Sequence, residues 1–273
     1  MKIYISADIE GISGVVNNSF TMPQGHEYQR ARKLMTDEVN AAVKGAKEAG
    51  ASEILVNDSH GPMTNILIED LDEEVVLISG DKKPLGMMEG IDSSYDAVLL
   101  IGYHSRHNAA GVLAHSYHGR VISEIKINHK IVGEFEFNTL VAGYYRVPVV
   151  FVSGDDVLAQ QVKAFDEKIE NLIVKKAISR YTAESLQPKK VHRLIEEGVY
   201  KSLKEESNNL TFHSIDGPIE LEITFLNSGM AEYTLLIPGV ELIEANKVRY
   251  IAKNIVEAYK MRTALTTLAA YTL

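Results

Sequence analysis

Short apolar segments that end abruptly in polar residues recur over the first 156 residues, and segments of helical character separate them. Four of these apolar segments are predicted to be strands: Lys2–Ile9, Ser52–Val56, Ala97–Ile101 and Val147–Val152. Residues 28–49 carry apolar side chains three and four positions apart, which predicts an amphipathic helix that stops at Gly50. A further helix is expected to begin near Val157. Because parallel strands are joined by crossovers that are usually helical, the sequence predicts an α/β fold with a doubly wound, mostly parallel sheet.

The segment that links the third and fourth of these strands has a different pattern. Residues 121–138 alternate around the tripeptide at 128–130, which predicts a β-hairpin with Glu134 on its second arm. Residues 139–145 are expected to form a short helix.

The pattern changes again after Pro188, where charged residues become frequent. Three elements are predicted there: a charged helix over residues 189–206, a strand over residues 219–226 and a long final helix over residues 244–267. We place a domain boundary near Glu184. The chain is then expected to comprise an α/β metal-binding catalytic domain over residues 1–184 and a smaller C-terminal α+β portion over residues 185–273.

The composition excludes several classes of protein. Cysteine is absent, so disulfides, thiolate metal sites and a cysteine nucleophile are excluded, and any metal must be held by nitrogen and oxygen. The net charge of −9 and the lack of a basic block argue against nucleic acid and anionic membranes as partners. Asp8 and Glu10 interrupt the position of a signal-peptide core, and no apolar run approaches the ~20 residues of a membrane helix. We therefore expect a cytoplasmic protein.

Acidic residues and histidines follow three of the predicted strands. Asp8 and Glu10 end the first, His60 follows the second, and His104 follows the third. The carboxyl ends of parallel strands share one edge of the sheet, where ligands bind, so these side chains are expected to meet. Two carboxylates and two imidazoles brought together need charge compensation, which a divalent cation supplies. Zinc suits such a nitrogen and oxygen site, and manganese, cobalt and iron are alternatives.

Glu134 is a fifth candidate ligand. It raises the count to three carboxylates and two imidazoles, enough for two metals if one carboxylate bridges them, as in many hydrolases. Each residue taken alone has an ordinary explanation, because strand-end acids cap helices and a glutamate on a hairpin usually faces solvent. Their joint occurrence is what predicts the site.

Other polar residues near these strand ends have more than one interpretation. His115 lies in a loop and can shuttle protons if that loop covers the edge, but His107 and His118 compete for the role. Asp155 and Asp156 can orient ligand histidines, although capping of the following helix is the simpler explanation.

The glycines of residues 11–14 suggest a phosphate-binding loop as a rival interpretation. The match is poor, because neither G-x-G-x-x-G nor G-K-[ST] is present and two carboxylates precede the loop.

Five motifs in register point to a known family. They are Ser6-Ala7-Asp8-Ile9-Glu10-Gly11, Asn57-Asp58-Ser59-His60, Gly102-Tyr103-His104, His115-Ser116 and Gly133-Glu134 with Asn138 following. Together they resemble the zinc-dependent D-aminopeptidase family, peptidase family M55, over most of the chain and in the same order. The resemblance is strongest up to Asp156.

This resemblance implies a binuclear zinc site with two zinc ions per subunit. In it Asp8 bridges the metals, Glu10 and His60 complete one of them, and His104 and Glu134 complete the other.

The resemblance also implies an activity and an assembly. His115 would be the catalytic histidine. The enzyme would release N-terminal D-amino acids such as D-alanine from short peptides, with a metal-activated water hydrolysing the peptide bond. The family further implies a homo-oligomer, a decamer of two stacked pentamers.

Two other functions stay open on the sequence alone. A two-metal phosphoesterase would use the same ligands together with a cluster of basic residues, for which Arg106 alone is thin support. A non-catalytic α/β ligand-binding module would keep the fold and bind no transition metal.

Overall fold

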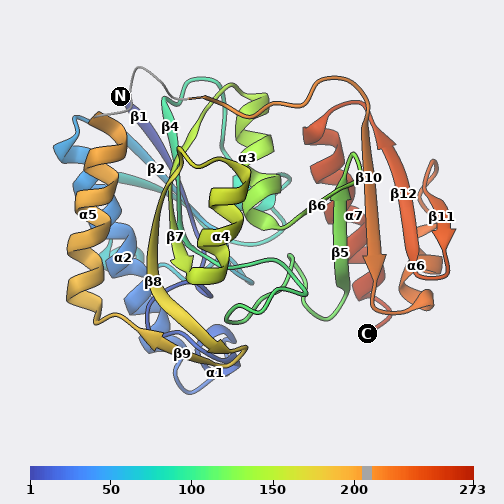
Figure 1. Cartoon of the computed structure of the whole chain (residues 1–273), viewed down its shortest axis with the longest axis horizontal. Coiled ribbons are helices and arrows are strands. Elements are labelled where there is room, and N and C mark those ends of the chain that lie inside the picture. Colours follow the sequence, from blue (N-terminus) through green and yellow to red (C-terminus); the bar gives the residue numbers. More distant parts are fainter. Residues whose placement is uncertain (205–210) are drawn as a thin grey trace.

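The computed structural model describes residues 1–204 and 211–273 and builds them around two sheets (Figure 1). The first, which we call the parallel sheet, has the strand order β3-β2-β1-β4-β7-β8-β9. Its strands are β1 (Lys2–Ala7), β2 (Glu53–Asp58), β3 (Val75–Ile78), β4 (Ala97–Tyr103), β7 (Val149–Asp155), β8 (Glu170–Ser179) and β9 (Thr182–Ser185). Every neighbouring pair is parallel except β8 and β9. The predicted mostly parallel α/β fold is confirmed.

Helices cover both faces of the parallel sheet (Figure 1). On one face α2 (Tyr28–Glu48) and α5 (Pro188–Lys204) pack against each other, and α3 (Glu134–Tyr144) and α4 (Asp156–Phe165) lie on the other. Strand β1 shows why this is possible, because its alternate side chains enter different cores. Ile3 and Ile5 pack into the core beside α2, whereas Tyr4 packs into the core that includes α3.

Short helical segments join these elements. They are α1 (Asn18–Thr21) and the 3₁₀ turns η1 (Ile68–Asp70) and η2 (Gly86–Met88). Among the described residues, no helix has both the length and the apolar character needed to cross a membrane.

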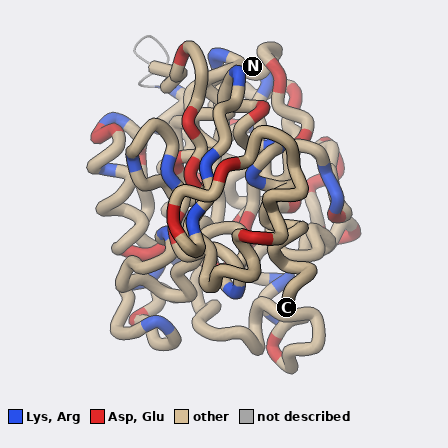
Figure 2. Tube along the Cα trace, turned by 90° about the vertical axis from the view of Figure 1, so that its right-hand side faces the viewer, with Lys and Arg blue, Asp and Glu red and all other residues tan. Residues whose placement is uncertain are grey.

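The second sheet is antiparallel throughout and has the order β11-β12-β10-β5-β6. Its strands are β5 (Ile122–Ile127), β6 (Lys130–Val132), β10 (Ile219–Phe225), β11 (Glu241–Glu244) and β12 (Lys247–Ala252). Strand β10 alternates buried apolar residues with partly exposed polar ones, as a sheet with one wet face requires. Figure 2, which views the molecule from this side, shows basic and acidic positions interleaved.

Two helices complete this half, α6 (Ser228–Thr234) and α7 (Ile255–Ala270), and α7 packs on β10, β12 and α3. The domain boundary predicted near Glu184 stays a prediction. Strands β5 and β6, which precede it, belong to the antiparallel sheet, whereas α5, which follows it, packs against α2.

The predicted hairpin is present with its turn where expected, but Glu134 does not lie on its second arm. Strands β5 and β6 form the hairpin, but the second arm ends at Val132 and Glu134 is the first residue of α3. The Glu136 carboxylate accepts a hydrogen bond of 2.7 Å from the Gly133 amide, which stabilises this helix start. Ten of the eleven residues of α3 are buried, so the helix shows no polar face and its sequence imitates an alternating strand.

The final helix begins later than predicted. Residues 241–252 form β11 and β12, and α7 starts after Asn254, whose side chain accepts a hydrogen bond of 2.9 Å from the Glu257 amide. The error arose because apolar residues of β12 happen to continue the spacing of the helix. The charged helix predicted over residues 189–206 corresponds to α5 as far as Lys204, and its last two residues lie outside the described part of the chain.

Candidate metal centre

The ends of three adjacent strands bring most of the predicted ligands together. In the register of the parallel sheet, Ala7 of β1 pairs with Asp58 of β2 and Ile101 of β4, so the three chains emerge at the same edge. Asp8 and Glu10 follow β1, His60 follows β2 and His104 follows β4. The fifth predicted ligand, Glu134, reaches the same place from the first turn of α3. We call these residues the buried cluster; its members are Asp8, Glu10, His60, His104 and Glu134.

Asp8 occupies the middle of the buried cluster. Its Oδ1 lies 3.4 Å from His60 Nδ1, and its Oδ2 lies 3.4 Å from His104 Nε2. Glu10 Oε2 is 2.7 Å from His60 Nδ1 on one side, and Glu134 Oε2 is 3.5 Å from His104 Nε2 on the other. The cluster thus divides into two halves that share one carboxylate.

Backbone carbonyls orient both imidazoles. His60 Nε2 lies 2.8 Å from the carbonyl oxygen of Thr21, and His104 Nδ1 lies 3.0 Å from that of Ser105. A carbonyl only accepts, so in each ring this nitrogen carries the proton and donates it. The other nitrogen of each ring faces the carboxylates, as in metal-binding histidines held by a backbone acceptor.

Water is nearly excluded from the buried cluster. Asp8, His104 and Glu134 are 2%, 2% and 3% exposed. With the ring protons directed at the backbone carbonyls, Asp8 Oδ2, Glu10 Oε2 and His104 Nε2 have no hydrogen-bond partner among the described residues. Three unpartnered polar atoms buried within one cluster are costly unless something binds them. Nitrogen and oxygen donors without thiolate fit zinc, so the residues present suit such an ion.

The charges of the buried cluster lead to the same conclusion. Burial and the neighbouring Glu10 carboxylate raise the pKa of Asp8 to about 8. Burial lowers the pKa of His104, but Glu134 and Asp8 more than offset it and raise this pKa to about 10. The cluster therefore retains protons near neutral pH in the absence of a cation, and a divalent cation would displace them.

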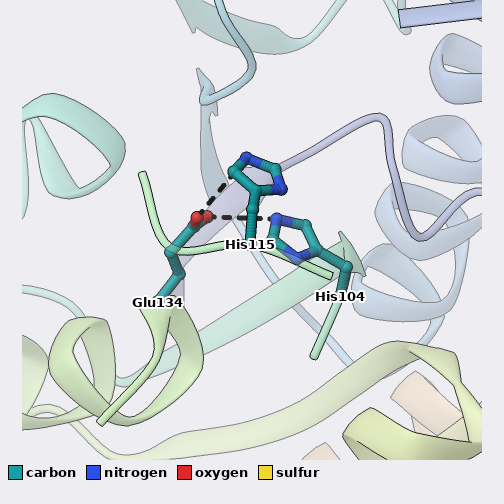
Figure 3. A group of neighbouring side chains, drawn as sticks. All are labelled: His104, His115 and Glu134. Atoms are coloured by element: carbon teal, nitrogen blue, oxygen red, sulfur yellow. Dashed lines mark ion pairs between the residues drawn. The ribbon is translucent and has the colours of Figure 1, made fainter. Parts of the chain in front are cut away.

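His115 stands beside the buried cluster, on the loop between β4 and β5. Its ring stacks on that of His104, with centroids 4.2 Å apart and planes 10° apart, and its Nε2 lies 3.9 Å from Glu134 Oε1. Figure 3 shows both rings side by side, with Glu134 facing them. His115 Nδ1 donates to the carbonyl of Leu113 at 2.9 Å, which leaves Nε2 free. Burial and the charge of His104 lower the pKa of His115.

A cavity of about 250 Å³ opens in front of the buried cluster. His115 and His118 both line it, together with residues of α7 and of the segment around Lys82 and Lys83. His107 instead lines a separate hollow of about 140 Å³ beside Arg106. The three histidines that compete in the sequence therefore differ in position, and only His115 stacks on a residue of the buried cluster.

The loop after β1 is stabilised by a buried residue that was not predicted from the sequence. Lys175 of β8 is buried and donates hydrogen bonds to the carbonyls of Glu10, Ile12 and Val15. The sequence contains one clue to this role, a lysine next to Val174 in an apolar segment. The clue was not decisive, because lysine is also common on the exposed edge strands of sheets.

The glycine loop does not form a phosphate cradle. The Gly11 amide donates to the carbonyl of Gly102 at 2.7 Å, and the Ser13 amide donates to Glu38 at 2.9 Å, so these donors are already used. A Cβ atom on Gly11 would lie 1.9 Å from the carbonyl oxygen of Tyr103, which explains why glycine is needed here.

Asp155 caps the helix that follows it, as the simpler interpretation of the sequence predicts. Its side chain accepts a hydrogen bond of 2.7 Å from the Leu158 amide at the start of α4. Its other oxygen accepts one of 2.7 Å from the Val112 amide, which anchors the loop that carries His115.

Known proteins resemble this chain over nearly its whole length. A model of the D-aminopeptidase family, peptidase family M55, matches residues 1–264. A D-aminopeptidase of Bacillus subtilis (strain 168) is 39% identical over 273 residues, which cover 100% of this chain and 99% of that protein. The solved structure of DppA from Bacillus subtilis, described as a zinc-dependent D-aminopeptidase and a self-compartmentalizing protease, matches with a TM-score of 0.96 and 38% identity, over 99% of this chain and 98% of its own. The chain therefore belongs to the D-aminopeptidase family, peptidase family M55.

Proposed function

We propose that the protein is a zinc-dependent aminopeptidase that releases N-terminal D-amino acids, such as D-alanine, from short peptides. The observation that carries the proposal is the buried cluster, whose unpartnered oxygen and nitrogen atoms face one another at the edge of the parallel sheet. Membership of the D-aminopeptidase family and the zinc dependence of the Bacillus subtilis neighbour support it.

The two halves of the buried cluster suit two zinc ions. Asp8 would contribute one oxygen to each, with Glu10 and His60 on one side and His104 and Glu134 on the other. When bound, zinc supplies Lewis-acid activation of water and of the scissile carbonyl. The protein contributes by holding the ligands in place and by excluding bulk water from them.

His115 is placed to move the proton that amide hydrolysis requires. The departing amine needs a proton, and an imidazole with one free nitrogen can take a proton from water and deliver it. The hydrogen bond from Nδ1 to Leu113 leaves Nε2 as the exchanging atom on the side of Glu134. The lowered pKa of His115 keeps this nitrogen unprotonated at neutral pH, ready to act first as a base.

The size of the cavity favours short substrates. At about 250 Å³ it lies below the usual range for drug-sized ligands, so a dipeptide or tripeptide is a better match than a folded protein.

A phosphoesterase would need several free cations at the same cavity. Lys83 Nζ already donates 2.6 Å hydrogen bonds to Asn57 Oδ1 and the carbonyl of Asp58, and Lys82 is exposed and paired with Asp81 at 3.5 Å. Among the described residues this leaves Arg262 as a single unpaired cation at the cavity, which is too few for a cluster of phosphate-binding residues and favours the peptidase.

We also propose that the subunits form a homo-oligomer, a decamer of two stacked pentamers. Large apolar side chains are exposed beside α6, on β12 and at the C-terminus: Leu236 is 67% exposed, Ile251 52% and Tyr271 81%. Burial of such residues against another copy is favourable. Native mass spectrometry should detect ten copies of the 30.2 kDa subunit, and a monomer at micromolar concentration would contradict the assembly.

The activity is tested with matched D-alanyl and L-alanyl amides and dipeptides. We expect hydrolysis of the D-substrates, loss of activity after chelation, and recovery on adding zinc. Equal rates for both enantiomers would exclude the D-specific assignment and retain the hydrolase. Full activity in a preparation shown to be free of transition metal would exclude the metal centre.

A further inference from the structure

Helix α7 contributes a basic residue to the cavity that the proposed reaction has not used. Arg262 lines the cavity together with Thr263, Thr266 and Thr267, which follow it along the same helix. Arg262 is only 6% exposed, so its guanidinium has lost most of its contact with bulk water. A buried positive charge of this kind normally has an anionic partner.

No such partner is present in the described parts of the chain. Arg262 forms no ion pair there, and its Nε is buried without a hydrogen-bond acceptor. Its neighbours are aromatic: the guanidinium carbon lies 3.5 Å from the ring centroid of Tyr117 and 4.4 Å from that of Tyr259. These rings orient the guanidinium by cation–π contact, but they leave its planar set of N–H donors available.

Arg262 is also close to the buried cluster. The Tyr117 ring that lies under the guanidinium belongs to the residue whose amide donates to Glu134 Oε1 at 2.5 Å. One residue therefore contacts both the arginine and a predicted ligand. The cavity between the cluster and Arg262 therefore suits a short molecule that is anionic at the end that meets the guanidinium.

We propose that Arg262 binds the free C-terminal carboxylate of the peptide substrate and thereby selects short peptides over blocked or longer ones. A carboxylate matches the fork of N–H donors of a guanidinium and can accept two hydrogen bonds from it. The proposal rests on the proposed function, because it assumes that the scissile bond lies at the buried cluster. It makes Arg262 a specificity residue on the leaving side of that bond.

The first test compares two substrates in the unaltered enzyme. D-alanyl-D-alanine carries the carboxylate, whereas its C-terminal amide is the same size and lacks the charge. We expect kcat/KM to be about 100-fold higher for the acid, mainly through KM, because a charge-assisted bidentate contact is lost in the amide. Equal values for the acid and the amide would overturn the proposal.

The second test uses Arg262→Gln and Arg262→Lys. For Arg262→Gln we expect the preference for the acid to fall to about twofold, while hydrolysis of D-alanine p-nitroanilide, which has no carboxylate, is retained. Arg262→Lys should restore part of the preference because it keeps the charge and loses the fork. Arg249→Gln is the matched control, because Arg249 is on β12 and pairs with Glu241, and it should leave the preference unchanged.

The outcomes separate this proposal from the proposed function. An equal loss on the dipeptide and on the anilide in Arg262→Gln, with metal content retained, would mean that Arg262 supports the fold and would overturn the specificity role. An unaltered, zinc-loaded enzyme that hydrolyses none of these substrates would overturn the proposed function instead, and the carboxylate site with it.

Discussion

Two clusters in this molecule contain the same kinds of side chain and differ in their surroundings. The buried cluster combines imidazoles and carboxylates at the edge of the parallel sheet. On the outer face of the antiparallel sheet, His129, Glu220 and Glu222 form a second group whose ligand atoms lie within 4.8 Å of one another, as do those of Asp8, Glu10 and His104 in the buried cluster. We call this second group the exposed cluster.

The two clusters differ in how far their side chains are exposed to solvent. The side chain of His129 is 80% exposed, and its Nδ1 lies 3.1 Å from Glu220 and 3.5 Å from Glu222. Arg249 lies 3.7 Å from Glu220 and compensates part of the negative charge. Water and a paired arginine thus satisfy the exposed cluster, whereas the carboxylates of the buried cluster are shielded from water and, among the described residues, no lysine or arginine pairs with them. Proximity of ligand residues is therefore a weak sign of a metal site unless burial leaves their atoms without partners.

The largest difference between the clusters should appear when one carboxylate is removed from each. We expect Asp8→Ala to lower kcat/KM by about 1000-fold or more and to release metal, because the proposed ligand shared by both halves is lost. Glu222→Ala should change both quantities by less than about twofold. Steady-state kinetics and metal analysis of the purified variants measure this. If Glu222→Ala also released metal, the distinction between the clusters would fail.

The next effect concerns the lysine beneath the buried cluster. Lys175→Met should lower the free energy of unfolding by about 3 kcal/mol, because three buried carbonyls would each lose a hydrogen-bond donor. Lys176→Met removes an exposed lysine from the same strand and should change it by less than about 0.5 kcal/mol. Urea denaturation of the metal-free proteins measures both. Equal losses would show that burial is not what makes Lys175 important.

An effect of similar size, spread over a range of pH, is expected in the pH dependence of stability. Burial raises the pKa of Glu38, which accepts from the Ser13 amide, to about 7 from an ordinary value of 4.5. The folded state therefore holds this proton more tightly than the unfolded state, so Glu38 makes stability fall as the pH rises from about 4.5 to 7, by roughly 3 kcal/mol.

Glu38→Gln keeps an acceptor for Ser13 and cannot titrate. The difference in unfolding free energy between this variant and the original protein should change across that pH range and level off above it. A constant difference from pH 4.5 to 8 would mean that Glu38 keeps an ordinary pKa.

The smallest effect is expected for the histidine of the exposed cluster. His129→Ala should shift the melting temperature by less than about 2 °C and leave the metal content unchanged, because an exposed ion pair contributes little. Calorimetry and metal analysis check this. A loss of metal in this variant would show that the exposed cluster also binds the ion.

Much of the fold was predictable because the spacing of apolar residues along the chain indicates its strands and helices. The apolar strand segments and the spacing in α2 agree with their final structure, and the strand-end rule brought Asp8, His60 and His104 to one edge. The position of Glu134 was predicted on the wrong element. A helix buried on every side has no polar face to reveal its period. Residues 244–252 were predicted to begin the final helix because short apolar spacings fit a strand or a helix equally well.

The amino-acid sequence by itself determined the chemistry that is available: nitrogen and oxygen donors without cysteine, placed directly after apolar strands that must be parallel. Such information is local, because hydrophobic periodicity and strand-end position are properties of neighbouring residues. Only the tertiary structure decided which polar atoms lose their water and their partners, how His115 stacks on His104, and that α7 brings Arg262 into the cavity. Burial depends on segments far apart in the chain that pack together, and it is burial that turns an ordinary polar residue into a binding residue.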